Sequence, residues 1–345
     1  MQYRLLGRSG LQVSAFSFGA MTFGGLGYFA SVGATQAADA RRQVDMALDA
    51  GVNLFDTADI YSQGRSEELL AEALGPRRPQ VVIATKAFGV TGHRGVNDRG
   101  ASRRHLVAAC EASLRRLNTD YIDLYQIHNQ DRLTPPEETL RALDDLVSAG
   151  KVRYIGSSNH AGWWQMKALA TSDRLGLVRY VSQQIQYSLR FRDSEAELLP
   201  LGVEEGVGAL IYSGLARGYL TGKFRGGDPG ETRIAAHGNL HDYDTPHGRR
   251  ILQAIDEVVA GRPGVTASQV ALNWVVRRPG VASVIIGART SEQLADNLAA
   301  STWSLSDAEM ARLDEASALT LPYPYARHLT ENAAHNPQPP LQPPL

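Results

Sequence analysis

Short apolar stretches alternate along the chain with longer stretches of helical periodicity, and this alternation constrains the fold more than any other feature. Most of the apolar stretches are continuous, which is typical of strands in a parallel sheet that is covered by helices. Counting AFSFGA, eight such stretches are present. They span 15–20, Val52–Phe55, Val81–Thr85, Tyr121–Ile127, Val152–Gly156, Tyr180–Ile185, Val207–Tyr212 and Val281–Ile286.

Two α/β architectures share this alternation, a closed (β/α)8 barrel and an open doubly wound sheet. Right-handed crossovers can close eight strand–helix units into a barrel, but the periodicity by itself leaves both architectures open. Tyr3–Leu6 and Leu11–Ser14 flank Gly7-Arg8-Ser9-Gly10, which predicts a β-hairpin before the first unit. A chain of 345 residues is long enough for two domains, yet α/β barrels often reach this length as one domain.

Several helix starts are predicted from capping residues and the helical spacing that follows them. Thr134-Pro-Pro-Glu137 has the pattern of a capping box with a proline in the first turn. A second capping box is predicted at Thr266 and Gln269. The other predicted helix starts are Thr35, Ser66, Ser102, Asp193, Thr290 and Ser306.

The composition excludes several classes of partner and site. With 35 basic and 36 acidic residues, the formal net charge is -1, so nothing indicates a nucleic-acid or membrane-surface partner. The single cysteine, Cys110, excludes an internal disulfide and a cysteine metal cluster, and we expect it to be buried. MQYRLLGRSG lacks the apolar core of a signal peptide, and no apolar run is long enough to cross a bilayer, so we expect a cytoplasmic protein.

Polar residues follow the apolar stretches where the predicted strands end. Asp56 ends the second strand, Lys86 follows the third and His128 ends the fourth. In a closed barrel the carboxyl ends of all strands meet at one rim, where active sites lie. We therefore expect these side chains to converge. Further residues at strand ends are Asn159, Gln184, Tyr187, Tyr212 and Gly287.

Tyr61, five residues after Asp56, adds a phenol to this rim. A phenol alone is too weak an acid to protonate a carbonyl oxygen readily at neutral pH. A neighbouring ammonium favours the phenolate, and a buried carboxylate holds the ammonium in place. Lys86 and Asp56 supply these two groups, and a histidine at His128 can orient the substrate oxygen. Together the residues predict a metal-free, proton-donating site that suits carbonyl reduction by an external hydride donor.

Plainer interpretations exist for each residue. Lys86 could be solvated at a strand end, His128 could be a core histidine, Tyr61 could serve packing and Asp56 could cap a helix. Other chemistries fit less well, because the sequence has no GxSxG, HExxH or P-loop motif. A glycosidase needs two facing carboxylates, and only Asp56 clearly lies at a strand end. The run Gly24-Gly25-Leu26-Gly27 is not a GxGxxG motif between a strand and a helix.

Seven segments, in this order, resemble the aldo-keto reductases. They are LGRSGLQVSAFSFGAMTFGG, FDTADIYSQGRSEELLAEAL, SLRRLNTDYIDLYQIHNQD, GKVRYIGSSN, QIQYSLR, IYSGLARGYLTGK and VIIGARTSEQLADNL. The resemblance covers about residues 1–320 and implies one (β/α)8 barrel, closed at its bottom by the hairpin, with extra C-terminal helices. A proline-rich tail, residues 321–345, would follow. The resemblance also implies reversible, NADPH-dependent reduction of an aldehyde or ketone.

Carried over residue by residue, the resemblance implies a role for each position of the predicted site. Tyr61 would be the general acid, and Lys86 and Asp56 would tune it. His128 would orient the carbonyl. Arg289 would hold the 2′-phosphate of the cofactor through its planar fork of donors, so we expect NADPH rather than NADH.

The resemblance implies cofactor contacts from several parts of the chain. Ser158, Asn159 and Gln184 would hydrogen-bond the nicotinamide carboxamide, and Tyr212 would stack on the nicotinamide ring. The loop 213–217, with Lys223, would cover the pyrophosphate, and the last five of the residues named below would surround the adenosine end. The implied residues are Ala20, Met21, Asp56, Ser158, Asn159, Gln184, Tyr212, Ser213, Gly214, Leu215, Ala216, Arg217, Lys223, Arg233, Gly287, Ala288, Arg289, Gln293 and Asn297.

Some departures from the family pattern bear on function. Ser62 stands where a glycine is common, so the loop beside Tyr61 could be shifted. The segments Gly24–Gly33 and Gly226–Arg249 hold many of the residues that would shape a substrate pocket. A second function is an NADP(H)-binding regulatory or sensor subunit with little turnover, because the family includes channel-associated members. A third is a barrel hydrolase or isomerase that needs no nicotinamide. The sequence predicts neither the individual substrate nor the oligomeric state.

Overall fold

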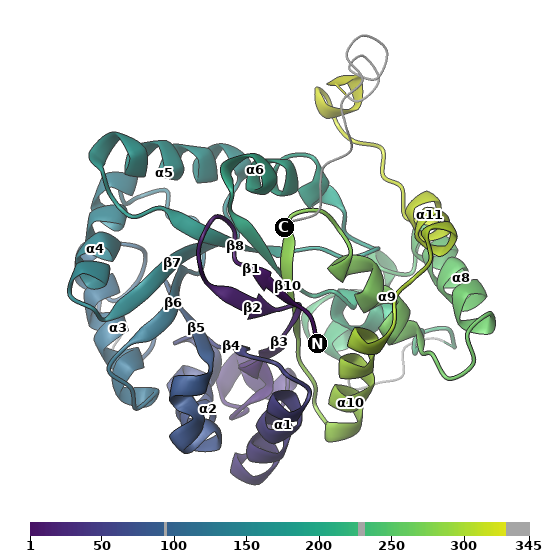
Figure 1. The fold of residues 1–345 in the computed structure, drawn as a ribbon, viewed down its shortest axis with the longest axis horizontal. Coiled ribbons are helices and arrows are strands. Elements are labelled where there is room, and N and C mark those ends of the chain that lie inside the picture. Colours follow the sequence, from purple (N-terminus) through teal and green to yellow (C-terminus); the bar gives the residue numbers. More distant parts are fainter. Residues whose placement is uncertain (93–94, 227–231, 329–345) are drawn as a thin grey trace.

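The computed structural model describes residues 1–92, 95–226 and 232–328, and its centre is a closed barrel of eight parallel strands (Figure 1). Around the barrel the strand order is β10-β3-β4-β5-β6-β7-β8-β9. The predicted (β/α)8 barrel is therefore confirmed, and the open sheet is excluded. The strands are β3 (Phe16–Gly19), β4 (Leu54–Asp56), β5 (Val82–Ala87), β6 (Ile122–Ile127), β7 (Val152–Ser158), β8 (Tyr180–Gln186), β9 (Gly208–Tyr212) and β10 (Val281–Ile286).

Helices surround the barrel as an outer layer, with α1 to α6 following one another around one side and α8 to α11 on the other (Figure 1). Within the described part of the chain, none of the helices combines the length and the apolar character that crossing a bilayer requires. The helices are α1 (Ala37–Asp49), α2 (Arg65–Leu74), α3 (Arg103–Arg116), α4 (Pro136–Ser148), α5 (Gly162–Leu175), α6 (Leu198–Glu205), α7 (Arg233–His237), α8 (Pro246–Ala260), α9 (Ala267–Val276), α10 (Ser291–Ala299) and α11 (Asp307–Ala316).

The predicted N-terminal hairpin is present, as β1 (Tyr3–Leu5) and β2 (Gln12–Ser14). Leu6 and Val13 pack in one buried cluster with Leu54 and with residues of the other strands near their amino ends. Since apolar side chains from the hairpin fill this end of the barrel, the hairpin closes it. The opposite, carboxyl end stays available for polar groups.

Strand periodicity explains how polar side chains enter the barrel. Leu54 and Ala84 belong to the interior cluster, whereas Phe55 belongs to the larger core between the strands and the helices. Alternate residues of a strand share a face. Asp56 and Lys86, two residues after Leu54 and Ala84, are therefore on the interior face at the carboxyl end.

The predicted capping box at Thr134 is wrong. Helix α4 begins at Pro136 after an N-cap at Pro135, and the Thr134 hydroxyl instead donates to the Asp131 carboxylate over 2.8 Å. At Thr266 half of the predicted box is present. The Thr266 hydroxyl accepts from the Gln269 N–H, but the Gln269 amide donates to another helix. Thr134 bonds a nearby residue outside the helix, and Gln269 bonds a distant one, so neither completes the predicted box.

Three other predicted helix starts are shifted. The N-caps of α1 and α2 are Gln36 and Gly64 rather than Thr35 and Ser66. Asp193 begins only a single 3-10 turn. The predicted caps at Ser102, Thr290 and Ser306 are confirmed, and Ser306 forms a complete capping box with Glu309.

Two further predictions concern the single cysteine and the C-terminal tail. Cys110 is buried, as predicted, and burial raises the pKa of its thiol to about 12. A thiol in this environment stays protonated and packs as an apolar group. Residues 329–345, which form most of the predicted tail, lie outside the described residues.

Candidate active site

A buried lysine lies beneath the carboxyl ends of the strands and contacts two of the predicted catalytic residues. The Nζ atom of Lys86 donates to Oδ2 of Asp56 over 2.6 Å and to the hydroxyl of Tyr61 over 3.3 Å. A further hydrogen bond goes to the carbonyl oxygen of Thr57, over 2.8 Å. The lysine side chain is fully buried, and these three acceptors match its three ammonium protons.

Two opposing effects act on the Lys86 ammonium. Burial lowers the pKa of Lys86, and the charges and hydrogen bonds of Asp56 and Tyr61 raise it. The second effect is stronger, so the pKa of Lys86 lies above the ordinary lysine value. Lys86 is therefore an ammonium at neutral pH. An ammonium beside a phenol stabilises the phenolate and makes the phenol a stronger acid.

The second oxygen of the Asp56 carboxylate is held by glutamine amides. Gln184 Nε2 lies 2.8 Å from Asp56 Oδ1, and Gln126 Nε2 lies 3.4 Å from the same oxygen. Both glutamines are buried on the barrel interior. The carboxylate thus has partners on both oxygens, which hold it in place beside Lys86. Gln126 was not predicted, although it follows the interior residue Leu124 by two positions on β6.

His128 lies beside Tyr61 in the cavity wall, with ring centroids 5.8 Å apart in an edge-to-face arrangement. Its backbone N–H donates to the carbonyl oxygen of Ala87, over 3.1 Å. Burial, with the positive charge of Lys86 as a smaller effect, lowers the pKa of His128 to about 3. The imidazole is therefore neutral at physiological pH and keeps one N–H donor. With His128, all four predicted catalytic residues are gathered at one place.

The polar residues after β7 hydrogen-bond to their neighbours at the rim. Asn159 Nδ2 donates to the carbonyl oxygen of His128 over 3.0 Å, and Asn159 Oδ1 accepts from the Tyr212 hydroxyl over 2.8 Å. Ser158 Oγ donates to the carbonyl oxygen of Gln184, over 3.0 Å. Ser158, Asn159, Gln184 and Tyr212 all line the cavity. The predicted Tyr187 does not, because it is buried against Trp274 in the core.

Ser62 helps to fix the conformation of the loop that carries Tyr61. Ser62, Gln63 and Gly64 have φ values of 49°, 57° and 91°, three left-handed residues in succession. The Ser62 hydroxyl donates to the carbonyl oxygen of Phe23 over 2.8 Å and accepts from the Leu26 N–H over 3.3 Å. The serine therefore ties the loop of Tyr61 to the segment Gly24–Gly33.

Two neighbouring cavities open at the carboxyl end of the barrel. The first, of 610 Å³, is lined by Asp56, Tyr61 and His128. The second, of 340 Å³, is lined by residues after β9 and β10 and from α10. The two cavities share wall residues, so together they suit one extended ligand. The shared residues are Thr22, Val32, Ser213, Arg217, Ile285 and Gly287.

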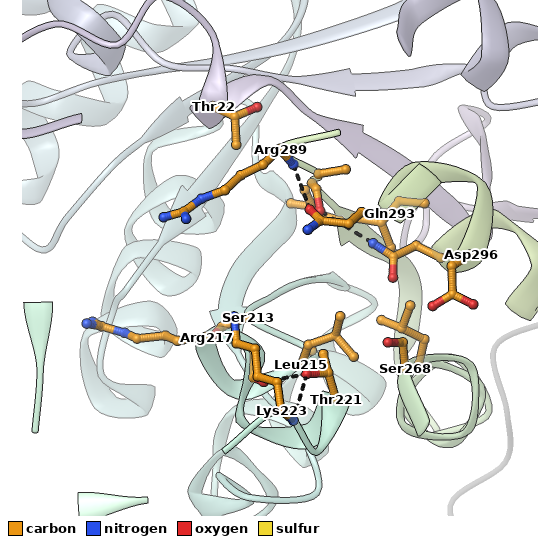
Figure 2. Close-up of a pocket in the computed structure, with 18 of the residues that line it drawn as sticks. Thr22, Ser213, Leu215, Arg217, Thr221, Lys223, Ser268, Arg289, Gln293 and Asp296 are labelled. Carbon is orange, nitrogen blue, oxygen red and sulfur yellow. Dashed lines mark hydrogen bonds between the residues drawn. The ribbon is translucent and has the colours of Figure 1, made fainter. Parts of the chain in front are cut away.

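Cationic side chains lie on two sides of the second cavity, which Asp296 also lines with its carboxylate bonded to Thr266 and Gln269. Figure 2 shows Arg289 on one side of the cavity and Arg217 and Lys223 on the opposite side. The guanidinium of Arg289 donates to the carbonyl oxygens of Ser31 and Val32, over 2.7 and 3.0 Å. This cation set is suited to an anionic ligand such as a phosphate.

Most of the predicted cofactor contacts line one of the two cavities. Ala20 and Ala216 are exceptions, because both are buried and neither lines a cavity. The side chain of Arg233 lies outside what the structure describes. The predicted residues that line a cavity are Met21, Asp56, Ser158, Asn159, Gln184, Tyr212, Ser213, Gly214, Leu215, Arg217, Lys223, Gly287, Ala288, Arg289, Gln293 and Asn297.

One buried polar atom points to a missing partner at the junction of the cavities. Ser213 Oγ has no hydrogen-bond partner within the described part of the chain, and Ser213 lines both cavities. Ser213, Ala216 and Arg217 have φ values of 60°, 49° and 56°, which non-glycine residues rarely adopt. Such strain clusters at ligand sites. These residues fit a bound cofactor that carries hydrogen-bonding groups and phosphates.

Sequence reasoning missed some cavity residues. Thr221 and Ser268 line the second cavity, but Thr221 lies in a 3-10 turn and Ser268 in the first turn of α9. Neither follows a strand, so the strand-end pattern carries no signal for them. Tyr28 and Phe29, which line the first cavity, lie in the segment Gly24–Gly33 that was expected to shape a pocket.

Comparisons with known proteins agree with this geometry. A model of the Aldo/keto reductase family matches residues 15–318. A probable voltage-gated potassium channel subunit beta of Arabidopsis thaliana is 38% identical over 312 residues, 87% of this chain and 91% of that protein. The uncharacterized oxidoreductase YrpG of Bacillus subtilis (strain 168) is 39% identical over 327 residues, 91% of this chain and 94% of that protein.

The family match covers nearly the whole barrel and includes all four residues at the buried lysine. It supports an oxidoreductase role and the use of a nicotinamide cofactor, which is general in this family. The chain belongs to the aldo/keto reductase family.

Proposed function

We propose that the protein is an NADPH-preferring reductase that converts an aldehyde or ketone to an alcohol. The observation that carries this proposal is the contact between Lys86 and Tyr61. The Nζ atom of the fully buried Lys86 lies 3.3 Å from the Tyr61 hydroxyl. Among the described residues, Tyr61 is the only tyrosine that both hydrogen-bonds Lys86 and lines the first cavity. This arrangement makes Tyr61 a proton donor toward a ligand in the first cavity.

Each of the other three residues has a separate task in the proposed reaction. Asp56 keeps Lys86 charged and in place, and it does not meet the substrate. His128, neutral and next to Tyr61, donates its N–H to the carbonyl oxygen and so aligns it with the phenol. As the carbonyl carbon is reduced, negative charge develops on this oxygen, and the Tyr61 proton neutralises it. The lysine positive charge stabilises the phenolate that remains.

The cofactor would lie across both cavities. When bound, a nicotinamide cofactor supplies the two electrons as a hydride. Ser158, Asn159 and Gln184 would hold its amide end. Arg217 and Lys223 lie at the second cavity, where they suit phosphate groups. Arg289 would prefer a cofactor with a 2′-phosphate, because a guanidinium binds phosphate through paired hydrogen bonds.

A turnover assay tests the proposal. Purified protein with NADPH and 4-nitrobenzaldehyde should consume NADPH, and Tyr61→Phe should lower kcat by roughly 10²- to 10⁴-fold, the usual contribution of a general acid. Tyr3→Phe is a matched control, because Tyr3 lies in the hairpin at the opposite end of the barrel, where its hydroxyl donates to the Gly51 carbonyl. Unchanged turnover in Tyr61→Phe would remove this residue from the reaction.

A second candidate function is that of a cofactor-binding regulatory subunit. It is favoured by the relatives that are named as potassium channel beta subunits, of which this chain covers about nine tenths at close to 38% identity. The two functions differ in a measurable way. A regulatory subunit would bind NADPH, seen as a change in Trp fluorescence, without reducing any of a panel of aldehydes and ketones. A hydrolase or isomerase of this fold would show no cofactor binding.

A further inference from the structure

The wall of the first cavity that faces Tyr61 is aromatic. The Phe29 ring centroid lies 5.2 Å from that of Tyr61, with the rings tilted by 60°. Tyr28 packs edge-on against Phe29, with centroids 5.3 Å apart. Both residues line the cavity, together with Leu26 and Ile60. A substrate whose oxygen reaches Tyr61 would therefore lie against the Phe29 ring.

The segment that carries Phe29 is held at three points. Its base is closed by Gly24 N–H to the Thr35 carbonyl and Thr35 N–H to the Thr22 carbonyl, over 3.0 and 3.1 Å. Ser62 holds the side next to Tyr61, and Arg289 binds the carbonyls at the far end of the turn. A wall fixed in this way can discriminate between ligand shapes, because it does not have to be ordered on binding.

Two polar groups near this wall, His128 and Asp56, offer a charged substrate no partner, and Arg217, a cation that lines this cavity, also lines the second one. His128 is neutral, since its pKa lies near 3, and Asp56 is already paired with Lys86 and Gln184. Leu26, Phe29 and Ile60 supply apolar surface to this cavity. Aromatic pairs prefer tilted or offset geometries with centroids 4.5 to 7 Å apart, and such contacts add to simple burial of apolar area. A flat ring next to Phe29 would meet this preference.

We propose that Phe29 is a specificity-determining residue and that the preferred substrates are uncharged aryl aldehydes or aryl ketones. The aryl ring lies against Phe29, and the carbonyl oxygen reaches Tyr61 and His128. This inference rests on the proposed reductase function and deepens it. The selecting residue comes from the segment Gly24–Gly33, before the first helix of the barrel.

A comparison of two substrates tests the inference. In Phe29→Ala, kcat/KM for 4-nitrobenzaldehyde should fall about tenfold more than kcat/KM for propanal, mainly through KM, because only the aryl substrate loses a ring contact. Phe29→Tyr keeps the ring and should keep the ratio of the two kcat/KM values at its wild-type level. Trp163→Ala removes an aromatic side chain from the exposed face of α5, away from both cavities, and should also leave this ratio unchanged. An equal fall for both substrates would overturn the inference.

A binding experiment separates this inference from the proposed function. Calorimetric titration with 4-nitrobenzamide, which carries the same ring but no reducible carbonyl, is carried out on the protein with NADP⁺. The dissociation constant should rise about tenfold from wild type to Phe29→Ala. If Phe29→Ala weakens the binding of 4-nitrobenzamide but the wild type reduces no aldehyde, the reductase function is wrong and the role of Phe29 in binding an aryl ring is supported. If the wild type reduces aldehydes but Phe29→Ala changes neither the substrate preference nor the dissociation constant of 4-nitrobenzamide, the reductase function is supported and the role of Phe29 is wrong.

Discussion

The guanidinium of Arg289 donates a hydrogen bond to the carbonyl oxygen of Ser31, with 2.7 Å between Nη2 and the oxygen. Ser31 ends the short turn that places Tyr28 and Phe29 at the first cavity, whereas Arg289 lines the second cavity. One side chain therefore joins the predicted adenosine end of the cofactor site to the aromatic wall of the substrate site. A phosphate at Arg289 would compete with these carbonyls for the same donors.

Arg289→Ala should weaken NADPH binding by roughly 10- to 100-fold and NADH binding by much less, because hydrogen bonds to charged groups contribute about 1.5–3 kcal/mol. Fluorescence titration with each cofactor gives the two dissociation constants. Arg141→Ala, an exposed arginine on α4, is the control and should leave both unchanged. Equal weakening of NADPH and NADH would show that Arg289 does not recognise a 2′-phosphate.

Asp56→Asn should lower the free energy of unfolding by roughly 3–5 kcal/mol, because it leaves the buried Lys86 ammonium without its counter-ion. The double variant Asp56→Asn/Lys86→Met should recover part of this loss, since no buried charge remains. Urea unfolding of the wild type, both single variants and the double variant gives the coupling energy. Additive losses would mean that the two side chains do not stabilise each other.

Ser62→Ala should lower the free energy of unfolding by about 1–3 kcal/mol, because the Phe23 carbonyl loses its buried donor. Ser62→Gly removes the same hydroxyl, but glycine adopts the φ of 49° without strain. It should therefore be more stable than Ser62→Ala by roughly 1 kcal/mol. Thermal unfolding of the two variants measures the difference. The reverse order of stability would exclude backbone strain at this position.

Asp59 should make stability depend on pH. Its carboxylate is buried and, in the described chain, has no well-aligned hydrogen-bond partner, and burial, with the nearby Glu67 charge, raises the pKa of Asp59 well above its ordinary value. Arg116, the backbone N–H of Ile60 and Lys86 oppose this shift without cancelling it. The unfolded chain therefore releases this proton at a lower pH than the folded protein.

It follows that Asp59 costs stability as pH rises from its ordinary pKa of about 3.9 toward its raised value in the fold. Asp59→Asn should match the wild type near pH 4 and become more stable than it as pH rises, by at most about 1.4 kcal/mol per pH unit. Urea unfolding at several pH values measures this. Asp49→Asn, at an exposed position on α1, is the control. Parallel curves for Asp59→Asn and wild type would contradict the prediction.

Local sequence patterns determine the strands of this fold and the polar residues at their ends. Continuous apolar runs such as Val281–Ile286 bury both faces, and a strand of this kind is stable only in a covered parallel sheet. Polar residues such as Asp56 and Lys86 occur where those runs end. Because all parallel strands of a barrel end at one rim, their convergence was predictable once the barrel was assumed.

Only the tertiary structure decided which distant partner several polar groups take. Ser66 and Gln269 have the chemistry of helix-capping residues, but the Ser66 hydroxyl donates to the Ala20 carbonyl and the Gln269 amide donates to Asp296. Arg289 has the fork of a phosphate ligand, yet here it binds the carbonyl of Ser31. A hydrogen bond between distant residues depends on distance and angle in space, and periodicity along the chain carries no record of either. The sequence by itself therefore determined the strand–helix units and the residues available at their ends, and the closing of the barrel decided which of those residues meet.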